Sequence, residues 1–126
     1  MRTRSQRLHD DLDEVCADIV KERDGHKCRR CGGAPVYWAH IIRRSRSKAV
    51  RWNPDNALAL CRSCHKWFDV SADKIQAAIF IEQMIGKEKM AELHELASSR
   101  NARPWLVYDL EKKLQELKEL RNEQLR

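Results

Sequence analysis

Two Cys-x-x-Cys pairs constrain the fold of this chain more than any other feature. The stretch HKCRRCGG supplies Cys28 and Cys31, and CRSCH supplies Cys61 and Cys64. A two-residue gap lets both sulfurs of a pair reach one ion at about 2.3 Å, and four thiolates complete the tetrahedral shell of zinc. We therefore expect a closed, structural Zn²⁺ site, with residues 32–60 inserted between its halves. An iron–sulfur cluster takes the same ligands, and we rank it below zinc.

The composition favours a small protein with a polyanionic partner. At 126 residues the chain is long enough for one domain, or for a small domain with an appendage. Such a chain buries a modest core, so a structural metal helps its stability materially. The formal net charge of +6 points to nucleic acid, because lysines and arginines set against phosphates release condensed counterions.

The sequence predicts an intracellular protein. MRTRSQRLHDDLDEV contains no signal-peptide core, and the longest uninterrupted apolar run, AAIFI at 77–81, is too short to span a bilayer. Thiols stay reduced inside cells, where paired cysteines bind metal more often than they form disulfides. The fifth cysteine, Cys16, lies in an apolar helical stripe and is expected to be buried and inert.

Apolar periodicity predicts a mostly helical α+β fold. Residues 8–23 have a helical period. VYWAHII and ALAL are short β-prone or apolar stretches that predict a small hairpin, and RSCHKWFDV has no breaker and predicts one short helix.

The pattern is helical from Ser71 onward. Three helices are expected there: one at 72–85, capped by Ser71 and ended by Gly86, one at about 87–99, and one from Pro104 toward the end. SSRNAR, residues 98–103, is the predicted linker between the last two.

Polar side chains in and after the insert predict a second site. His40 lies at the end of a predicted strand, which can hold its imidazole rigidly, and Asn56 follows it. His65 and Asp69 are four residues apart, so on a helix they could present an imidazole and a carboxylate to one divalent ion. Two other interpretations of His65 are that it replaces a cysteine on the zinc, or that it only packs.

VKERDGHKCRRCGG, then AHI, then NPDNALALCRSCHKWF resembles the HNH (ββα-metal) endonuclease family in its zinc-stapled form. The resemblance covers roughly residues 19–70. It implies that His40 is a general base acting on water and that His65 binds one catalytic divalent cation, Mg²⁺, Mn²⁺ or another. It also implies that Asn56 either steadies the His40 loop or touches that cation, and that the four cysteines hold structural zinc.

The sequence predicts three parts, and the resemblance implies a function. The parts are an N-terminal helix in 1–25, an HNH ββα-metal core with zinc knuckles in 26–70, and a helical extension in 71–126. The function is hydrolysis of phosphodiester bonds in duplex or branched DNA, by nicking or by double-strand cutting. A phage or prophage accessory nuclease of recombination or packaging, in the cytoplasm of a bacterial host cell, fits this size. The alternative is a non-catalytic zinc-finger module that binds DNA.

One position departs from the family pattern. Many members place a metal-binding Asp, Glu or His just before the first histidine, where this chain has Ala39. Three explanations are open: Asp69 and Asn56 supply the missing ligand, metal binding is weak, or the site is degenerate. We expect Asp69 to supply the ligand. The chain also resembles the NinG-like phage recombination proteins in three features: a small residue at this position, the stretch RWNPDN and a helical tail. This second resemblance is looser, because this chain has CH where those proteins tend to have CN.

A basic loop and a leucine-rich tail complete the predictions. The loop after His40 is expected to clamp the DNA backbone without reading sequence, through Arg43, Arg44, Arg46, Lys48 and Arg51. The alternative is a solvated, mobile loop. The tail PWLVYDLEKKLQELKELRNEQLR predicts an amphipathic helix. This helix either packs on the helices at 72–99 or forms a homodimer seam.

Overall fold

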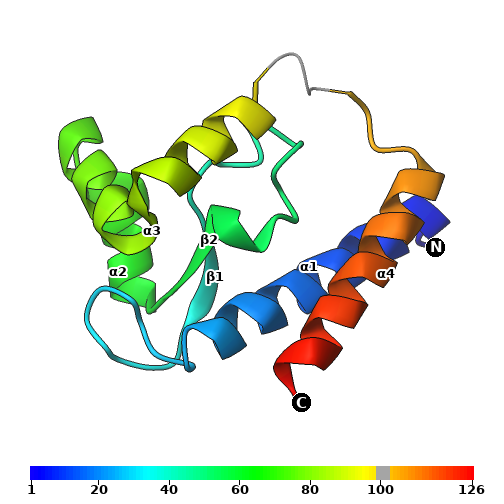
Figure 1. The fold of residues 1–126 in the computed structure, drawn as a ribbon, viewed down its shortest axis with the longest axis horizontal. Coiled ribbons are helices and arrows are strands. Elements are labelled where there is room, and N and C mark those ends of the chain that lie inside the picture. The colour runs from blue at the N-terminus through cyan, green and yellow to red at the C-terminus, as the bar shows by residue number, and fades with distance from the viewer. Residues whose placement is uncertain (99–102) are drawn as a thin grey trace.

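The computed structural model describes residues 1–98 and 103–126 and has the predicted α+β fold (Figure 1). Its elements, in chain order, are α1 (Arg4–Arg23), β1 (Tyr37–His40), the 3-10 turn η1 (Pro54–Asn56), β2 (Ala57–Leu60), α2 (Arg62–Lys66), the π-helical turn η2 (Trp67–Ser71), α3 (Lys74–Leu96) and α4 (Val107–Gln124). None of the helices in the described ranges is long and apolar enough to cross a membrane.

The hairpin predicted from VYWAHII and ALAL is the centre of the fold. β1 and β2 pair antiparallel, with Tyr37 opposite Leu60 and His40 opposite Ala57. Every residue of β2 is buried, and the hairpin lies between α3 and the pair formed by α1 and α4 (Figure 1). His40 therefore stands at the end of a strand whose partner is fixed in the core.

α1 and α4 form a parallel pair. Contacts run in the same order along both helices, from Arg4–Glu111 to Asp18–Arg121. The buried side chains of the pair are Leu8, Leu12, Val15, Cys16, Ile19, Leu110, Leu114 and Leu117. Cys16 is fully buried, and this burial raises its pKa to about 12, as expected for an inert thiol.

The packing of the tail corrects the prediction made for it. Leu110, Leu114 and Leu117 of the tail pack against α1 rather than on the helices at 72–99. Since these three leucines are buried within the chain, they give no support to a homodimer through α4.

The boundaries of α3 and α4 differ from those predicted. Asp73, not Ser71, caps α3 by accepting a hydrogen bond from the Gln76 backbone N–H at 2.7 Å. Gly86 is not helical, with φ of 85° and ψ of 162°, so α3 consists of two helical segments that meet at a kink there, and the predicted break at Gly86 is confirmed.

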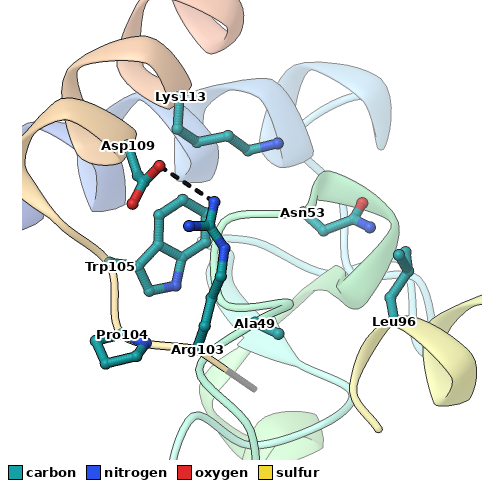
Figure 2. Close-up of a pocket in the computed structure, with 8 residues that line it drawn as sticks. All are labelled: Ala49, Asn53, Leu96, Arg103, Pro104, Trp105, Asp109 and Lys113. Carbon is teal, nitrogen blue, oxygen red and sulfur yellow. Dashed lines mark hydrogen bonds and ion pairs between the residues drawn. The ribbon is translucent and has the colours of Figure 1, made fainter. Parts of the chain in front are cut away.

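α4 begins at Val107 rather than at Pro104. Leu106, the N-cap, is extended, and the Trp105 indole N–H donates to the Lys48 carbonyl at 3.0 Å. Figure 2 shows the cavity beside this indole; the ion pair between Arg103 and Asp109 forms part of its lining. Most of the linker predicted at 98–103 lies outside the described residues.

Candidate functional site

The four cysteines of the two Cys-x-x-Cys pairs come together in one cluster. Cys28 and Cys31 lie in the turn after α1, while Cys61 is the N-cap of α2 and Cys64 lies in its first turn. All four Sγ atoms lie within 4.8 Å of one another, and those of Cys31 and Cys61 are 3.6 Å apart. Tetrahedral zinc with Zn–S bonds of about 2.3 Å places sulfurs about 3.8 Å apart. The cluster therefore fits a metal ion such as zinc.

The surroundings of the cluster suit thiolates. The Ser63 hydroxyl and the Cys64 backbone N–H lower the pKa of Cys61 to about 6. Burial raises the pKa of the Cys64 thiol to about 12. A metal ion that binds such a thiol deprotonates it outright. The Arg30 guanidinium lies 3.6 Å from the Cys64 sulfur and stacks on the Trp67 ring at 3.8 Å. Its positive charge offsets part of the negative charge of four thiolates.

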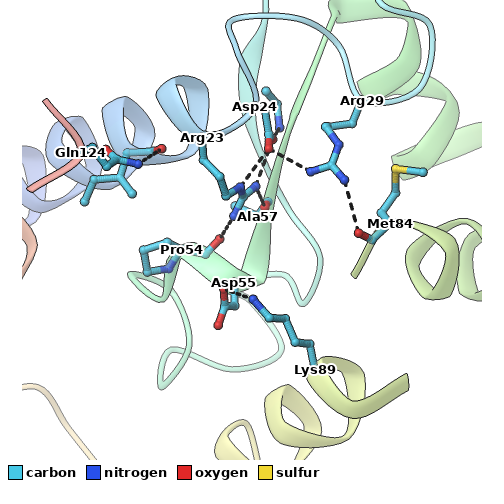
Figure 3. A network of polar contacts seen from close by, with 11 residues as sticks. Arg23, Asp24, Arg29, Pro54, Asp55, Ala57, Met84, Lys89 and Gln124 are labelled. Atoms are coloured by element: carbon cyan, nitrogen blue, oxygen red, sulfur yellow. Dashed lines mark hydrogen bonds and ion pairs between the residues drawn. The ribbon is translucent and has the colours of Figure 1, made fainter. Parts of the chain in front are cut away.

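A buried carboxylate ties the cysteine turns to the hairpin (Figure 3). Asp24, whose side chain is 1% exposed, accepts hydrogen bonds from Arg23, from Arg29 and from the Ala59 backbone N–H. Burial alone would raise the pKa of Asp24, but these bonds and the charge of Arg23 outweigh burial and lower it. Arg29 also donates to the Met84 carbonyl of α3. One carboxylate thus joins the end of α1, the first cysteine turn, β2 and α3.

The second site is an open cleft beside the hairpin. It is lined by Trp38, His40, Arg43, Arg44, Ser45, His65, Asp69 and Val70. The structure therefore places the two predicted histidines and the predicted carboxylate on one cleft, which β1, the loop after it, α2 and η2 form together. The cavity beside Trp105 in Figure 2 shares no lining residue with it.

His40 is held in one tautomer. Its Nε2 lies 2.9 Å from the Arg51 carbonyl oxygen, and a carbonyl only accepts, so Nε2 carries the proton and Nδ1 the lone pair. Burial lowers the pKa of His40 below its ordinary value of 6.5, outweighing the hydrogen bond to Arg51, which raises it. The imidazole is therefore neutral at pH 7, with Nδ1 able to accept a proton.

His65 and Asp69 form a pair across one turn. The Nε2 of His65 lies 2.9 Å from an Oδ of Asp69. Neighbouring ligands of an octahedral Mg²⁺ at 2.0–2.1 Å are about 3 Å apart, so these two atoms fit one such ion. The turn that presents Asp69 is π-helical, closed by a 2.7 Å bond from the Ala72 N–H to the Trp67 carbonyl. The sequence predicted an ordinary helix here, and a one-turn widening of this kind is frequent at functional sites.

Asn56 lies behind the cleft rather than in it. Its side chain is fully buried and accepts from the Ile42 N–H at 2.8 Å while it donates to the Ile42 and Val50 carbonyls. These three bonds hold the segment that follows His40 against η1. Of the two roles that the family resemblance left open for Asn56, this geometry supports steadying of the His40 loop and not contact with a cation.

The predicted phosphate clamp divides into two groups. Arg43, Arg44, Arg46 and Lys48 are exposed, and the first two line the cleft. Arg51 differs from these four: its side chain is 14% exposed and pairs with Asp13 of α1 at 2.8 Å. The guanidinium is used inside the protein, where it neutralises a carboxylate that no motif in the sequence singled out.

Arg43 also contacts the candidate metal ligand. Its guanidinium donates to the Asp69 carbonyl oxygen at 2.6 Å and lies 3.7 Å from the Asp69 carboxylate. The loop after β1 is therefore joined to η2 across the cleft.

Comparison with known proteins agrees with this geometry. Residues 28–72 match the HNH endonuclease family, and every residue that lines the cleft lies within them. A protein of Lactococcus phage SK1 named "Probable HNH endonuclease" is 42% identical over 55 residues, which is 38% of this chain and 58% of the relative. The chain thus spans little more than half the length of that relative. No solved structure matches this chain. Residues 28–72 are thus similar to the HNH endonuclease family.

Proposed function

We propose that this chain is a metal-dependent endonuclease that hydrolyses phosphodiester bonds in duplex or branched DNA, by nicking or by cutting both strands. One observation carries the proposal: a neutral His40 of fixed tautomer shares a cleft with the His65–Asp69 pair. The similarity to a phage protein supports an accessory role in phage or prophage recombination or packaging, inside the bacterial host.

His40 serves as the general base. Its Nδ1 takes a proton from a water molecule, while the Arg51 carbonyl holds Nε2–H and stabilises the imidazolium that forms. Because burial lowers the pKa of His40, the basic form is the main one at cellular pH.

His65 and Asp69 would hold the divalent cation, through the imidazole and the carboxylate that lie 2.9 Å apart. When bound, such an ion neutralises charge that develops on the scissile phosphate and the leaving oxygen. Zinc on the four cysteines has no open position and fixes the cleft without entering the chemistry.

The DNA backbone is held by the exposed cations next to the cleft. Arg43 and Arg44 line it, and Arg46 and Lys48 extend the same loop. Contacts of this kind position DNA without reading its sequence. Asn56 supports this loop from behind through its three backbone bonds.

A plasmid-nicking assay tests the proposal. Wild type, His40→Ala and His65→Ala are incubated with supercoiled plasmid and Mg²⁺ or Mn²⁺, with His94→Ala as a control for loss of an exposed histidine outside the cleft. We expect cation-dependent nicking by wild type and control, with a loss of at least about 100-fold in both cleft variants.

The same assay distinguishes the nuclease from the alternative, a zinc-finger module that only binds DNA. One observation favours that alternative: Ala39 is 2% exposed and supplies no ligand. A gel shift without nicking by the wild type, with either cation, would establish binding alone and reject the nuclease. Circular dichroism and metal content show that each variant is folded.

A further inference from the structure

Asp13, in the middle of α1 and outside the family segment, anchors two consecutive residues of the loop behind the cleft. One of its carboxylate oxygens accepts from Arg51 Nη2 at 2.8 Å, and the other accepts from the Trp52 indole N–H at 2.8 Å. The backbone at 51–52 is therefore held against α1 by two side chains that converge on one carboxylate.

The two partners of Asp13 are more buried than Asp13 itself, whose side chain is 30% exposed. Trp52 is 1% exposed, and its ring packs edge-on against Trp105 at 5.1 Å and His9 at 5.0 Å. The Arg51 side chain is 14% exposed and lies over the Trp52 ring at 4.8 Å. A lost carboxylate leaves a buried indole N–H and a mostly buried guanidinium without their acceptor.

The main chain of Arg51 completes a path to the cleft. The Arg51 carbonyl accepts the hydrogen bond from His40 Nε2–H at 2.9 Å, while the Arg51 side chain binds Asp13. Displacement of this residue by a fraction of an ångström moves the acceptor and frees the ring.

We propose that Asp13 is a positioning residue for His40: by fixing Arg51 it sets the place of the carbonyl that holds the imidazole in the Nε2–H tautomer. Asp13 touches neither substrate nor cation. The inference rests on the proposed function only in that it assigns a purpose to the orientation of His40. It also gives the N-terminal helix, which the family segment lacks, a part in the site.

Nuclear magnetic resonance of the imidazole tests the contact directly. In ¹⁵N-labelled, zinc-loaded protein, the His40 ring is assigned by comparison with His40→Ala. Wild type is expected to show protonated Nε2, unprotonated Nδ1 and a slowly exchanging Hε2 proton. Asp13→Asn keeps the size of the side chain but sets an amide NH₂ against one donor. We expect it to show mixed tautomers and a rapidly exchanging Hε2.

Two further variants separate positioning from general destabilisation. Arg51→Met keeps the main-chain carbonyl but removes the anchor, and it is expected to reproduce the His40 spectrum of Asp13→Asn even if the latter folds poorly. Asp11→Asn, an exposed position on the same helix, is expected to keep the wild-type spectrum. A purely structural role for Asp13 predicts lower thermal stability with an unchanged His40 ring.

Activity provides the second measurement. Asp13→Asn is expected to lower kcat by about 10- to 100-fold through misplacement of the base. KM for plasmid DNA should change less than about twofold, because the cations that line the cleft are unaltered.

Unchanged tautomer and Hε2 exchange in both Asp13→Asn and Arg51→Met would overturn the inference. If the wild type cuts no DNA with any divalent cation, the proposed function is rejected. The spectra still decide whether Asp13 positions His40, so the two failures are distinct.

Discussion

Replacement of Asp24 by asparagine is expected to destabilise the protein by about 2–3 kcal/mol. The carboxylate accepts four hydrogen bonds: two from Arg23, one from Arg29 and one from the Ala59 N–H. Each carboxylate oxygen accepts two of these bonds. An asparagine of the same shape therefore keeps at most two of the four bonds and turns an NH₂ toward the other two donors. Breaking a buried ion pair costs about 3–5 kcal/mol. We take less here, because both arginines are 32% exposed and partly regain water.

The assay is urea unfolding of zinc-loaded protein at pH 7, followed by helical circular dichroism, with metal content measured in parallel. At about 4 °C per kcal/mol for a domain of this size, the loss corresponds to a fall in Tm of about 10 °C. Asp18→Asn is the matched control on the same helix. Asp18 and Arg121 are 50% and 33% exposed, so the loss of this surface pair costs less than about 1 kcal/mol.

The pH dependence gives the sign of the effect. The folded-state pKa of Asp24 is lowered, so its contribution is present above the ordinary aspartate pKa near 4 and is lost as pH falls through the folded value. The difference in unfolding free energy between wild type and Asp24→Asn should therefore be constant from pH 5 to 7 and narrow below about pH 4. A difference below about 0.5 kcal/mol at pH 7, or one equal to that of Asp18→Asn, would refute the reasoning.

Three further predictions concern the candidate site. Because the pKa of His40 is lowered, kcat/KM for nicking should fall on the acid side with a midpoint below 6.5, and a midpoint above 7 in the pH profile would contradict this. Asn56→Ala leaves one N–H and two carbonyls unpaired in the core and should cost about 3 kcal/mol in urea unfolding, whereas a loss below 1 kcal/mol would show that the loop holds itself. Removal of the cysteine-bound metal by a chelator should lower Tm by more than about 10 °C, reversibly on addition of Zn²⁺; an unchanged Tm would mean that the cysteines hold no structural ion.

Short-range patterns in the sequence predicted much of the fold. The Cys-x-x-Cys spacing predicted the four-sulfur cluster, and the β-prone stretches predicted the hairpin with His40 at the end of a strand. The i,i+4 spacing of His65 and Asp69 predicted that they lie on one face, and their side chains are 2.9 Å apart. Each of these features is set by a few neighbouring residues, so periodicity and spacing are enough to identify it.

Long-range packing was not accessible in the same way. The leucine stripe of α4 shows that one face is apolar, but an apolar face fits any other, and the choice of α1 depends on the whole fold. The pairing of the Arg51 side chain depends likewise on Asp13, which is far away in sequence and belongs to no motif. A run of basic residues shows where charge is dense, not which guanidinium is already paired.

The departure at Ala39 has a physical explanation in the hairpin. Neighbouring residues of a strand face opposite sides, and Ala39 packs in the core with Cys28, Leu58 and Phe80, while His40 lines the cleft. A carboxylate at position 39 would be desolvated in this core unless a cation met it there, and alanine avoids that cost. Under the proposed function, the second ligand then has to come from the other wall of the cleft. The π-helical turn that carries Asp69 supplies it there, held in place by Arg43.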